Sequence, residues 1–429
     1  MDACPLEALV PELRSQFPSL KRRTDADEPV IYLDGPAGSQ VPQPVIAAIS
    51  DYYAHHNANS GGKFPSSHET SSMMAEAHQA AADWFNASDW RECIFGSNMT
   101  TLTFALSRAL AQTWRPGHRV VVTELDHDGN VTPWRLAARD AGVEVATVRV
   151  NPADATLDID DFRRQVTPGT RLVALTAASN SVGSKPPLHD LIAVAHAVGA
   201  EVYVDAVHYA PHGLIDVQAW DADYCVCSAY KFFGPHVGLL WGRLSRLEEL
   251  TAYKLRPAPS QPPGKWMTGT QNFAAIAGTK AAIDYLASIG QRVSGAEHAP
   301  RSRRQALQQA FAAIEAWERR LCQQLLAGLA EIPGVQVFGI TDSHRWSDRV
   351  PTLALTIDGW TSSQAAEALG SRGIFAWHGD YYAVDVCRAL GQSSHGMLRL
   401  GLLHINTPHE VARTLQAITR LASTRPEIL

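Results

Sequence analysis

The chain has 429 residues, of which 45% are hydrophobic and 19% charged, and its formal net charge is −6 at pH 7. This length exceeds what one hydrophobic core usually supports, so we expect a globular protein with one large and one smaller domain. The sequence has no Lys/Arg cluster, which argues against a nucleic-acid partner. It also has no run of about 18 apolar residues, which argues against a membrane-spanning helix.

The N-terminal sequence and the cysteines indicate the compartment. The first residues, MDACPLEALVPEL, carry acidic groups and lack the positive segment and apolar run of a secretory signal. The six cysteines are scattered without a CxxC pair, at Cys4, Cys93, Cys225, Cys227, Cys322 and Cys387. We therefore expect reduced thiols and a cytoplasmic protein.

Strands and helices alternate between about residues 90 and 242. Helical spacing of apolar residues predicts helices at 102–110, 133–141 and 188–198. Apolar or β-rich runs predict strands at 94–95, 119–123, 143–150, 171–177, 201–204, 224–227 and 237–241. This alternation predicts a mostly parallel seven-stranded sheet with helices on both faces, an α/β fold whose ligands sit beyond the carboxyl ends of the strands.

The rest of the chain predicts a second, smaller domain. A Pro-rich stretch at 256–264 is typical of a surface loop, and residues 301–329 form a helix-rich run that would bridge two domains. The remaining strands and helices form an α+β domain, whose last helix begins at the capping box of Thr407 and Glu410. We expect an N-terminal segment (1–30) joining the substrate side, a large domain (31–300) and a small C-terminal domain (301–429).

A lysine follows one of the apolar strands directly. Lys231 stands in Ser228-Ala-Tyr-Lys231-Phe-Phe-Gly234, immediately after the strand predicted at 224–227. Burial lowers the pKa of a lysine and makes the neutral amine available for Schiff-base chemistry. A lysine that extends from a strand end to solvent is an equally good interpretation of this window alone.

An aspartate ends the preceding predicted strand, in Val202-Tyr-Val-Asp205-Ala-Val-His208. A buried aspartate needs a cationic partner, and the pyridinium nitrogen of pyridoxal phosphate (PLP) is one. The alternatives are a capping aspartate or a metal ligand. Because Asp205 lies one strand–helix step before Lys231, the two strand ends should be neighbours, which favours PLP as the cofactor; no metal site is assigned.

Two further strand ends carry polar groups. Asn98, Met99 and Thr100 open the helix that starts near residue 102, and a helix N-terminus binds phosphate well, although such residues are also common caps. His127 follows the strand at 119–123 at the same predicted edge as Asp205 and Lys231. It is a candidate for stacking on the cofactor ring, although a single histidine is more often structural.

Taken in order, these motifs resemble those of class V aminotransferase-fold PLP enzymes, in the cysteine desulfurase-like branch. The resemblance runs from Tyr-Leu-Asp-Gly-Pro-Ala-Gly-Ser-Gln-Val-Pro at 32–42 to Arg399 and Asn406-Thr407. It implies the fold type I of PLP-dependent transferases. It also implies that Lys231 forms the Schiff base, that Asp205 pairs with the pyridine nitrogen and that His127 stacks on the ring.

The resemblance extends to the other cofactor ligands. It implies that His208, where relatives often have Gln, binds the phenolic oxygen with help from Asn180. Thr100 and Ser228 match phosphate ligands. Tyr230 stands where desulfurases usually have His and would reach the phosphate. Thr270 matches a threonine that contacts the phosphate of the other subunit, which implies a homodimer with shared active sites.

Arg399 matches the arginine that binds the substrate α-carboxylate, so the resemblance implies an amino-acid substrate. The small-domain window departs from the desulfurase pattern. Tyr382 stands where desulfurases have the nucleophilic cysteine, and Trp377 stands where they have arginine. We expect Trp377, His378 and Tyr382 to line the substrate region. Cys387 lies in a predicted helix at 384–390 and is interpreted as a packing residue.

These observations favour a carbon–sulfur β-lyase acting on a cysteine-derived amino acid. An aminotransferase or epimerase of the same family is the alternative, because reprotonation at a different carbon would give either outcome. A PLP-binding protein without turnover is disfavoured, because both the lysine and the carboxylate-binding arginine are retained and no DNA-binding appendage is present.

Overall fold

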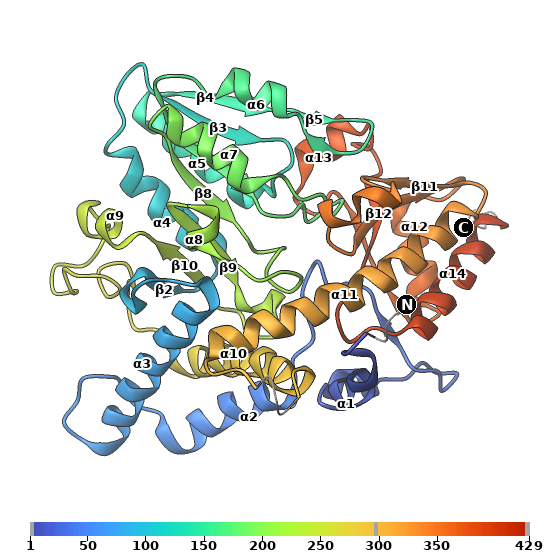
Figure 1. Ribbon diagram of the computed structural model, residues 1–429, viewed down its shortest axis with the longest axis horizontal. Coiled ribbons are helices and arrows are strands. Elements are labelled where there is room, and N and C mark those ends of the chain that lie inside the picture. The colour runs from blue at the N-terminus through green and yellow to red at the C-terminus, as the bar shows by residue number, and fades with distance from the viewer. Residues whose placement is uncertain (1–3, 296–298, 425–429) are drawn as a thin grey trace.

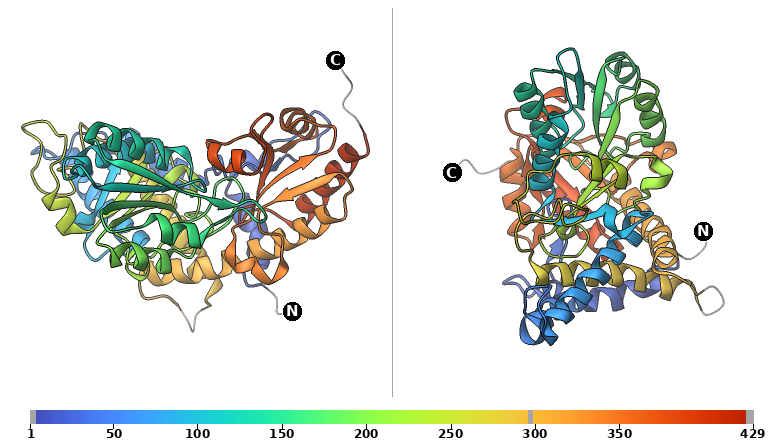
Figure 2. Two further views of the ribbon diagram at one scale, coloured as in Figure 1. Left: turned by 90° about the horizontal axis from the view of Figure 1, so that it is seen from above. Right: turned by 90° about the vertical axis from the view of Figure 1, so that its left-hand side faces the viewer.

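The computed structural model describes residues 4–295 and 299–424, so residues 1–3 and 425–429 of the predicted terminal segments lie outside the described part. Two sheets lie side by side, and two long helices, α10 (Phe273–Val293) and α11 (Arg303–Ala330), connect them (Figures 1 and 2). The N-terminus and the C-terminal helices lie with the smaller sheet.

The larger sheet has seven strands and is mostly parallel, as predicted. β10 is the exception, because it runs antiparallel to both of its neighbours. In their order across the sheet the strands are β2 (Cys93–Gly96), β10 (Gly238–Gly242), β9 (Tyr224–Ser228), β8 (Glu201–Asp205), β7 (Thr170–Thr176), β3 (Arg119–Thr123) and β4 (Glu144–Val148).

Helices bury both faces of this sheet, because both faces are apolar. Along β3, Val120 and Val122 belong to one apolar core and Val121 to the other, as the alternation of a strand requires. One face packs against α4 (Met99–Ala111) and α5 (Thr132–Ala141). The elements that contact the other face or its edge include α3 (Pro65–Phe85), α6 (Ile159–Gln165) and α7 (Leu188–Ala197), and α8 (Val217–Trp220) packs against α7.

The prediction of a single strand at 143–150 is wrong. β4 ends at Val148, and a separate hairpin of β5 (Val150–Asn151) and β6 (Thr156–Leu157) follows. Two acidic side chains break the strand, because Asp161 Oδ2 accepts from Arg149 N at 2.9 Å and Glu124 Oε2 accepts from Val150 N at 3.0 Å. These bonds take the backbone donors that a longer β4 would use.

The smaller sheet has four antiparallel strands, in the order β11 (Val335–Phe338), β12 (Thr352–Ile357), β15 (Met397–Gly401) and β14 (Trp377–Gly379). Its helices are α12 (Ser362–Gly370), α13 (Val384–Ala389) and α14 (Pro408–Ala422), the last with the predicted capping box. Beside this sheet, β1 (Ile31–Tyr32) pairs in parallel with β13 (Ile374–Phe375) in a separate two-stranded sheet, and Asp34 forms an isolated bridge with Gly401 of β15. The residue limits of the predicted domains stay a prediction.

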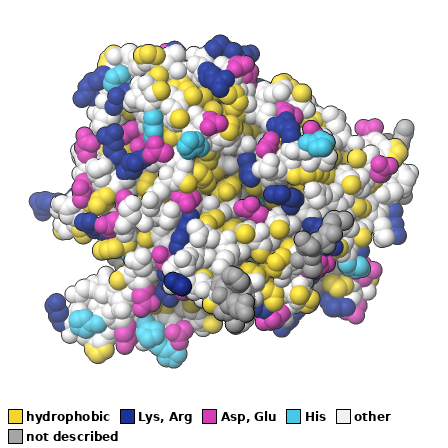
Figure 3. Space-filling model, viewed as in Figure 1, with side chains coloured by type: hydrophobic (Ala, Val, Ile, Leu, Met, Phe, Trp, Pro, Cys, Tyr) yellow, Lys and Arg dark blue, Asp and Glu magenta, His cyan; other side chains and the backbone are white. Residues whose placement is uncertain are grey.

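The remaining helices lie at the surface or on the long helices: α1 (Val10–Ser15), α2 (Gln43–Asp51) and α9 (Leu244–Glu249). Within the described ranges, no helix combines the length and the apolar character that crossing a bilayer requires. On the face shown in Figure 3, Lys and Arg side chains are interspersed with Asp and Glu. The absence of a nucleic-acid partner stays a prediction.

The contact between α10 and α11 predicts a sensitive glycine. A Cβ atom at Gly290 would lie 1.8 Å from Ala306 O, so Gly290→Ala must push the two helices apart. We expect the free energy of unfolding to fall by about 1–3 kcal/mol, measured by urea denaturation. Gly370→Ala, at a helix end with no atom within 4 Å of the added carbon, is the control and should not destabilise the protein. If Gly290→Ala had the same free energy of unfolding as Gly370→Ala and the wild type, the close packing of α10 against α11 would be contradicted.

Candidate active site

Lys231 and Asp205 meet at one edge of the larger sheet. Asp205 is the last residue of β8, and Lys231 ends the short 3-10 helix η6 (Ala229–Lys231) that follows β9. β8 and β9 pair in parallel, so their carboxyl ends are adjacent. Both side chains are buried and line the same cavity of about 500 Å³. The structure thus brings together the two residues on which the sequence-based hypothesis depends.

Burial changes the ionisation of both groups. Burial, together with the positive charge of the nearby Arg399 guanidinium, lowers the pKa of Lys231 to about 7. Burial raises the pKa of Asp205 to about 6, against a backbone hydrogen bond from Val207 N at 2.8 Å. A neutral amine is therefore accessible on Lys231 near neutral pH, as nucleophilic or proton-transfer chemistry requires.

The N-terminus of α4 points at this cavity. Asn98, Met99 and Thr100 all line the cavity, and the helix begins at Met99, three residues before the predicted start. Asn98 caps the helix through Thr101 N at 2.8 Å, and Met99 N donates to Ser228 Oγ at 3.1 Å. A helix N-terminus with hydroxyls beside it suits a phosphate group.

Gly238 makes this approach of β10 to the α4 N-terminus possible. A Cβ atom at Gly238 would lie 2.4 Å from the backbone carbon of Asn98. Any side chain here would displace the loop before α4, so this glycine, the first residue of β10, has a positional role.

His127 lines the cavity and caps the 3-10 helix η5 (Asp128–Asn130). Its Nδ1 accepts from Gly129 N at 2.9 Å, which assigns the ring proton to Nε2 in the neutral form. Burial, with Lys231 and Arg399 nearby, lowers the pKa of His127 to about 4, so the ring is neutral. The ring stacks on Tyr382, with centroids 5.5 Å apart and an interplanar angle of 27°.

His208 and Asn180 present unpaired polar atoms. His208 Nε2 lies 2.9 Å from Thr352 Oγ1, and Asn180 Nδ2 donates to Tyr381 O at 2.9 Å. Among the described residues, His208 Nδ1 and Asn180 Oδ1 have no hydrogen-bond partner, although both are buried and both residues line the cavity. Buried polar atoms of this kind indicate that the cavity takes a polar occupant.

Arg399 reaches this region from β15, where it is paired across the sheet with Trp377. It is buried, donates through Nη1 to Asn180 O at 3.0 Å, and its guanidinium carbon lies 4.3 Å from the centroid of the Tyr381 ring. Its Nη2 lies 3.6 Å from Asp34 Oδ1. A planar guanidinium with an aromatic face behind it is well suited to binding a carboxylate.

Sequence reasoning missed Asp34 as a site residue. Asp34 interacts electrostatically with both Arg399 and Lys231, and burial raises its pKa to about 6. Lys231 Nζ also donates to the carbonyl oxygens of Pro36 and Ala37 in the same segment. The motif at 32–42 was the available signal, but the sequence does not say which of its residues faces the cavity. Thr176 and Ala178, which also line the cavity, carried no signal.

Other predicted residues lie at the edge of the cavity or outside it. Tyr230 lines the cavity and stacks on His236 with centroids 4.9 Å apart. Trp377 and His378 lie on β14 and are exposed, and Tyr382 is 70% exposed. Thr270 is exposed and does not line the cavity of its own chain.

The chain matches the Aminotransferase class-V family model over residues 31–309 and 305–414. It is 28% identical over 435 residues to a cysteine desulfurase of Synechococcus elongatus, covering 96% of this chain and 63% of that longer protein. It is 31% identical over 422 residues to the aminotransferase-like protein FGM3 of Gibberella zeae, covering 95% and 97% of the two chains. An apo cysteine desulfurase from Thermococcus onnurineus has the same fold, with a TM-score of 0.85 at 22% identity over 96% of this chain and 98% of that one.

The thiol nearest to Tyr382 in the sequence is inaccessible. Cys387 lies in α13 and is 1% exposed, and burial raises the pKa of its thiol to about 12. Among the cysteines, all six of which lie in the described ranges, Cys4 alone is not fully buried. We expect iodoacetamide at about pH 8 to modify Cys4 and to leave Cys387 unmodified until the protein is unfolded. Peptide mass spectrometry with Cys387→Ser as the reference checks this. Modification of Cys387 at the rate of Cys4 would contradict the burial.

Proposed function

The chain belongs to the class V aminotransferase family, whose members are pyridoxal phosphate enzymes, and from this premise we propose that it is a cysteine desulfurase-like carbon–sulfur β-lyase. The observation that carries the proposal is the buried Lys231 beside Asp205 in one cavity that the N-terminus of α4 also lines. Arg399 adjoins it through its hydrogen bond to the carbonyl of Asn180, a lining residue. The substrate is an amino acid with a sulfur leaving group on Cβ.

The residues present fit pyridoxal phosphate. The hydroxyls and backbone N–H groups at the start of α4 suit its phosphate, and the Asp205 carboxylate suits its pyridine nitrogen. The unpaired His208 Nδ1 and Asn180 Oδ1 suit its ring substituents, and the Lys231 amine suits its carbonyl carbon. When bound, the cofactor supplies a sink for the electron pair left at the substrate Cα.

The side chains of this protein have separable roles in such a reaction. Arg399 binds the substrate carboxylate with its two Nη atoms, which now contact Asn180 O and Asp34. Lys231, with its pKa lowered to about 7, accepts the Cα proton as a neutral amine. His127 is neutral and packs over the cavity with Tyr382 outside it, which keeps water from the reacting carbon.

We propose that sulfur leaves as a product, because no cysteine is among the described residues that line the cavity. A tyrosine cannot form a persulfide, Tyr382 stands at the cysteine position, and Cys387 is buried. With cysteine as substrate the balance is cysteine plus water giving pyruvate, ammonia and hydrogen sulfide. Transamination is the second candidate, because FGM3, one of the relatives, bears an aminotransferase-like name.

Two further properties belong to the proposal. Thr270 is exposed in the same connection as Tyr253 and Leu255, which are 60% and 69% exposed. Large apolar side chains on a surface are typical of a contact with another chain, so we propose a homodimer in which Thr270 reaches the partner's phosphate site. The six free thiols support a reducing compartment, the cytoplasm.

We expect the purified protein to carry the cofactor on Lys231. Borohydride reduction followed by peptide mapping should place the label on Lys231 and leave Lys265, another buried lysine, unlabelled. Asp205→Asn should keep the visible absorbance of the bound cofactor and lose roughly 100-fold or more of the turnover rate, because a neutral amide cannot hold the pyridine proton. A label on another lysine, or near wild-type turnover by Asp205→Asn, would overturn these assignments.

Incubation with L-cysteine tests the reaction itself. We expect equal amounts of sulfide and pyruvate, and the same rate from Cys387→Ser, since that thiol takes no part. Lys231→Ala is the inactive control. Alanine as the product with a persulfide on Cys387 would show a desulfurase instead. Amino transfer to a keto acid without sulfide release would show an aminotransferase.

A further inference from the structure

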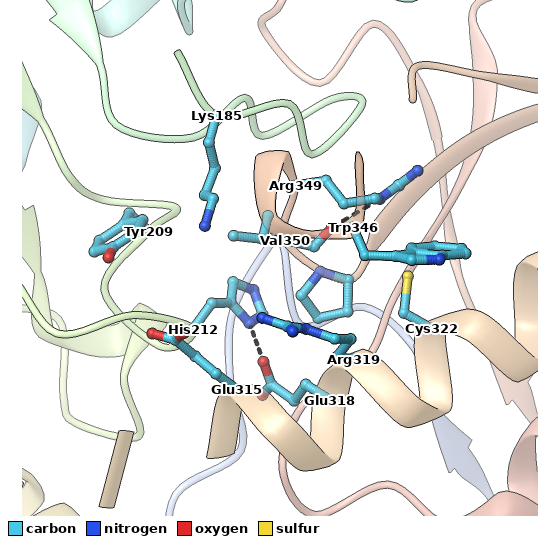
Figure 4. A pocket seen from close by; sticks show the side chains of 11 residues that line it. Lys185, Tyr209, His212, Glu315, Glu318, Arg319, Cys322, Trp346, Arg349 and Val350 are labelled. Atoms are coloured by element: carbon cyan, nitrogen blue, oxygen red, sulfur yellow. Dashed lines mark hydrogen bonds and ion pairs between the residues drawn. The ribbon is translucent and has the colours of Figure 1, made fainter. Parts of the chain in front are cut away.

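A second pocket, of about 450 Å³ and partly open to solvent, lies between α11 and the segments that follow β7, β8 and β11. In Figure 4, Lys185 points from one wall toward His212, and Glu315, Glu318 and Arg319 extend from α11 on the opposite wall. The other lining residues are Tyr209, Cys322, Trp346, Arg349, Val350 and Pro351.

Charges of both signs meet in this pocket without pairing. Within the described part of the chain, Lys185 Nζ, the Glu315 carboxylate and the Arg319 guanidinium make no hydrogen bond or ion pair, although Glu315 and Arg319 are one turn apart on α11. Burial lowers the pKa of Lys185 and raises the pKa of Glu315. Lys185 and Glu315 are partly buried, whereas Arg319 lies at the exposed rim. Their charges influence one another only through space, so a bound group that makes direct hydrogen bonds to the partly buried pair is favourable.

The inner wall carries a buried polar atom without a partner. His212 Nδ1 lies 2.8 Å from Glu318 Oε2, and both side chains are 2% exposed. His212 Nε2 has no hydrogen-bond partner among the described residues. Arg349, by contrast, is occupied by the carbonyl oxygens of Ile340 and Thr352 and serves as a fixed wall. The free nitrogen of His212 therefore marks the side on which an occupant would bind.

The pattern of charges selects the class of ligand. A simple anion would satisfy Lys185 and Arg319 but lie against Glu315, and a simple cation would do the reverse. A small molecule with one carboxylate and one ammonium group satisfies all three. We propose that this pocket is a second binding site for a small zwitterionic amino acid, with its carboxylate at Lys185 and Arg319 and its ammonium group at Glu315.

The second pocket shares a wall with the candidate active site. His212 lines the pocket, His208 lines the active-site cavity, and their ring centroids are 5.3 Å apart. A ligand that fixes the His212 ring therefore also restrains the neighbouring ring of His208, whose Nδ1 is unpaired and which lines the active-site cavity. The inference goes beyond the proposed reaction and makes the second site regulatory: an amino acid bound there influences the site where an amino acid is converted.

Calorimetry on the borohydride-reduced holoenzyme tests the second site, because a cofactor fixed to Lys231 no longer exchanges with an amino acid. We expect L-alanine to bind at one site per chain. Propionate and ethylamine each lack one of its two charges and should bind about tenfold more weakly or not at all. Glu315→Gln and Lys185→Gln should each weaken L-alanine binding about tenfold.

Exposed residues of the same types provide the controls. Glu331→Gln, at the residue that follows α11, and Lys21→Gln should bind L-alanine as wild type does. Propionate binding as tightly as L-alanine would make the pocket an anion site and overturn the proposal. Binding that Glu315→Gln and Lys185→Gln leave unchanged, or no binding at all, would overturn it as well. Because no turnover is measured, these outcomes do not depend on the lyase assignment.

Discussion

The parallel pairing of β8 with β9 is the constraint on which the candidate active site depends. It forces the ends of two buried strands to one edge of the sheet, and the sequence places an aspartate at one end and a lysine just beyond the other. Burial lowers the pKa of Lys231 to about 7 and raises that of Asp205 to about 6, so neither charge is well stabilised by the protein alone. The fold tolerates this cost because a group that bonds to both residues removes it.

Local patterns in the sequence were sufficient for the sheet and for this pair. The strands are short apolar runs separated by helical spacing, and a polar residue after such a run must lie at a strand end. Where side chains compete for the backbone, the same reasoning failed. The run at 143–150 has the composition of one strand, but the carboxylates of Asp161 and Glu124 divide it, and both lie outside the run.

Contacts between distant segments could not be predicted. Asp34 faces Arg399 because the strand segment after β1 bridges to Gly401 at the end of β15, and no periodicity in either segment indicates that pairing. The stacking of Tyr382 on His127 depends on backbone conformation. Tyr381 and Tyr382 both have positive φ angles, 56° and 58°, which residues other than glycine rarely adopt.

Hydrogen bonds from distant segments hold that strained pair. The carbonyl of Tyr381 accepts from Asn180, the carbonyl of Tyr382 accepts from Asp128 N at 2.7 Å, and the Tyr381 hydroxyl donates to Met397 O. The loop is thus bound to the segments on both sides of the cavity, and such anchoring sustains unfavourable φ angles. A loop held this way keeps the Tyr382 ring stacked on His127, which lines the cavity. The stacked pair of Tyr382 and His127 therefore depends on contacts between distant segments, because the local backbone preference of two tyrosines opposes this conformation.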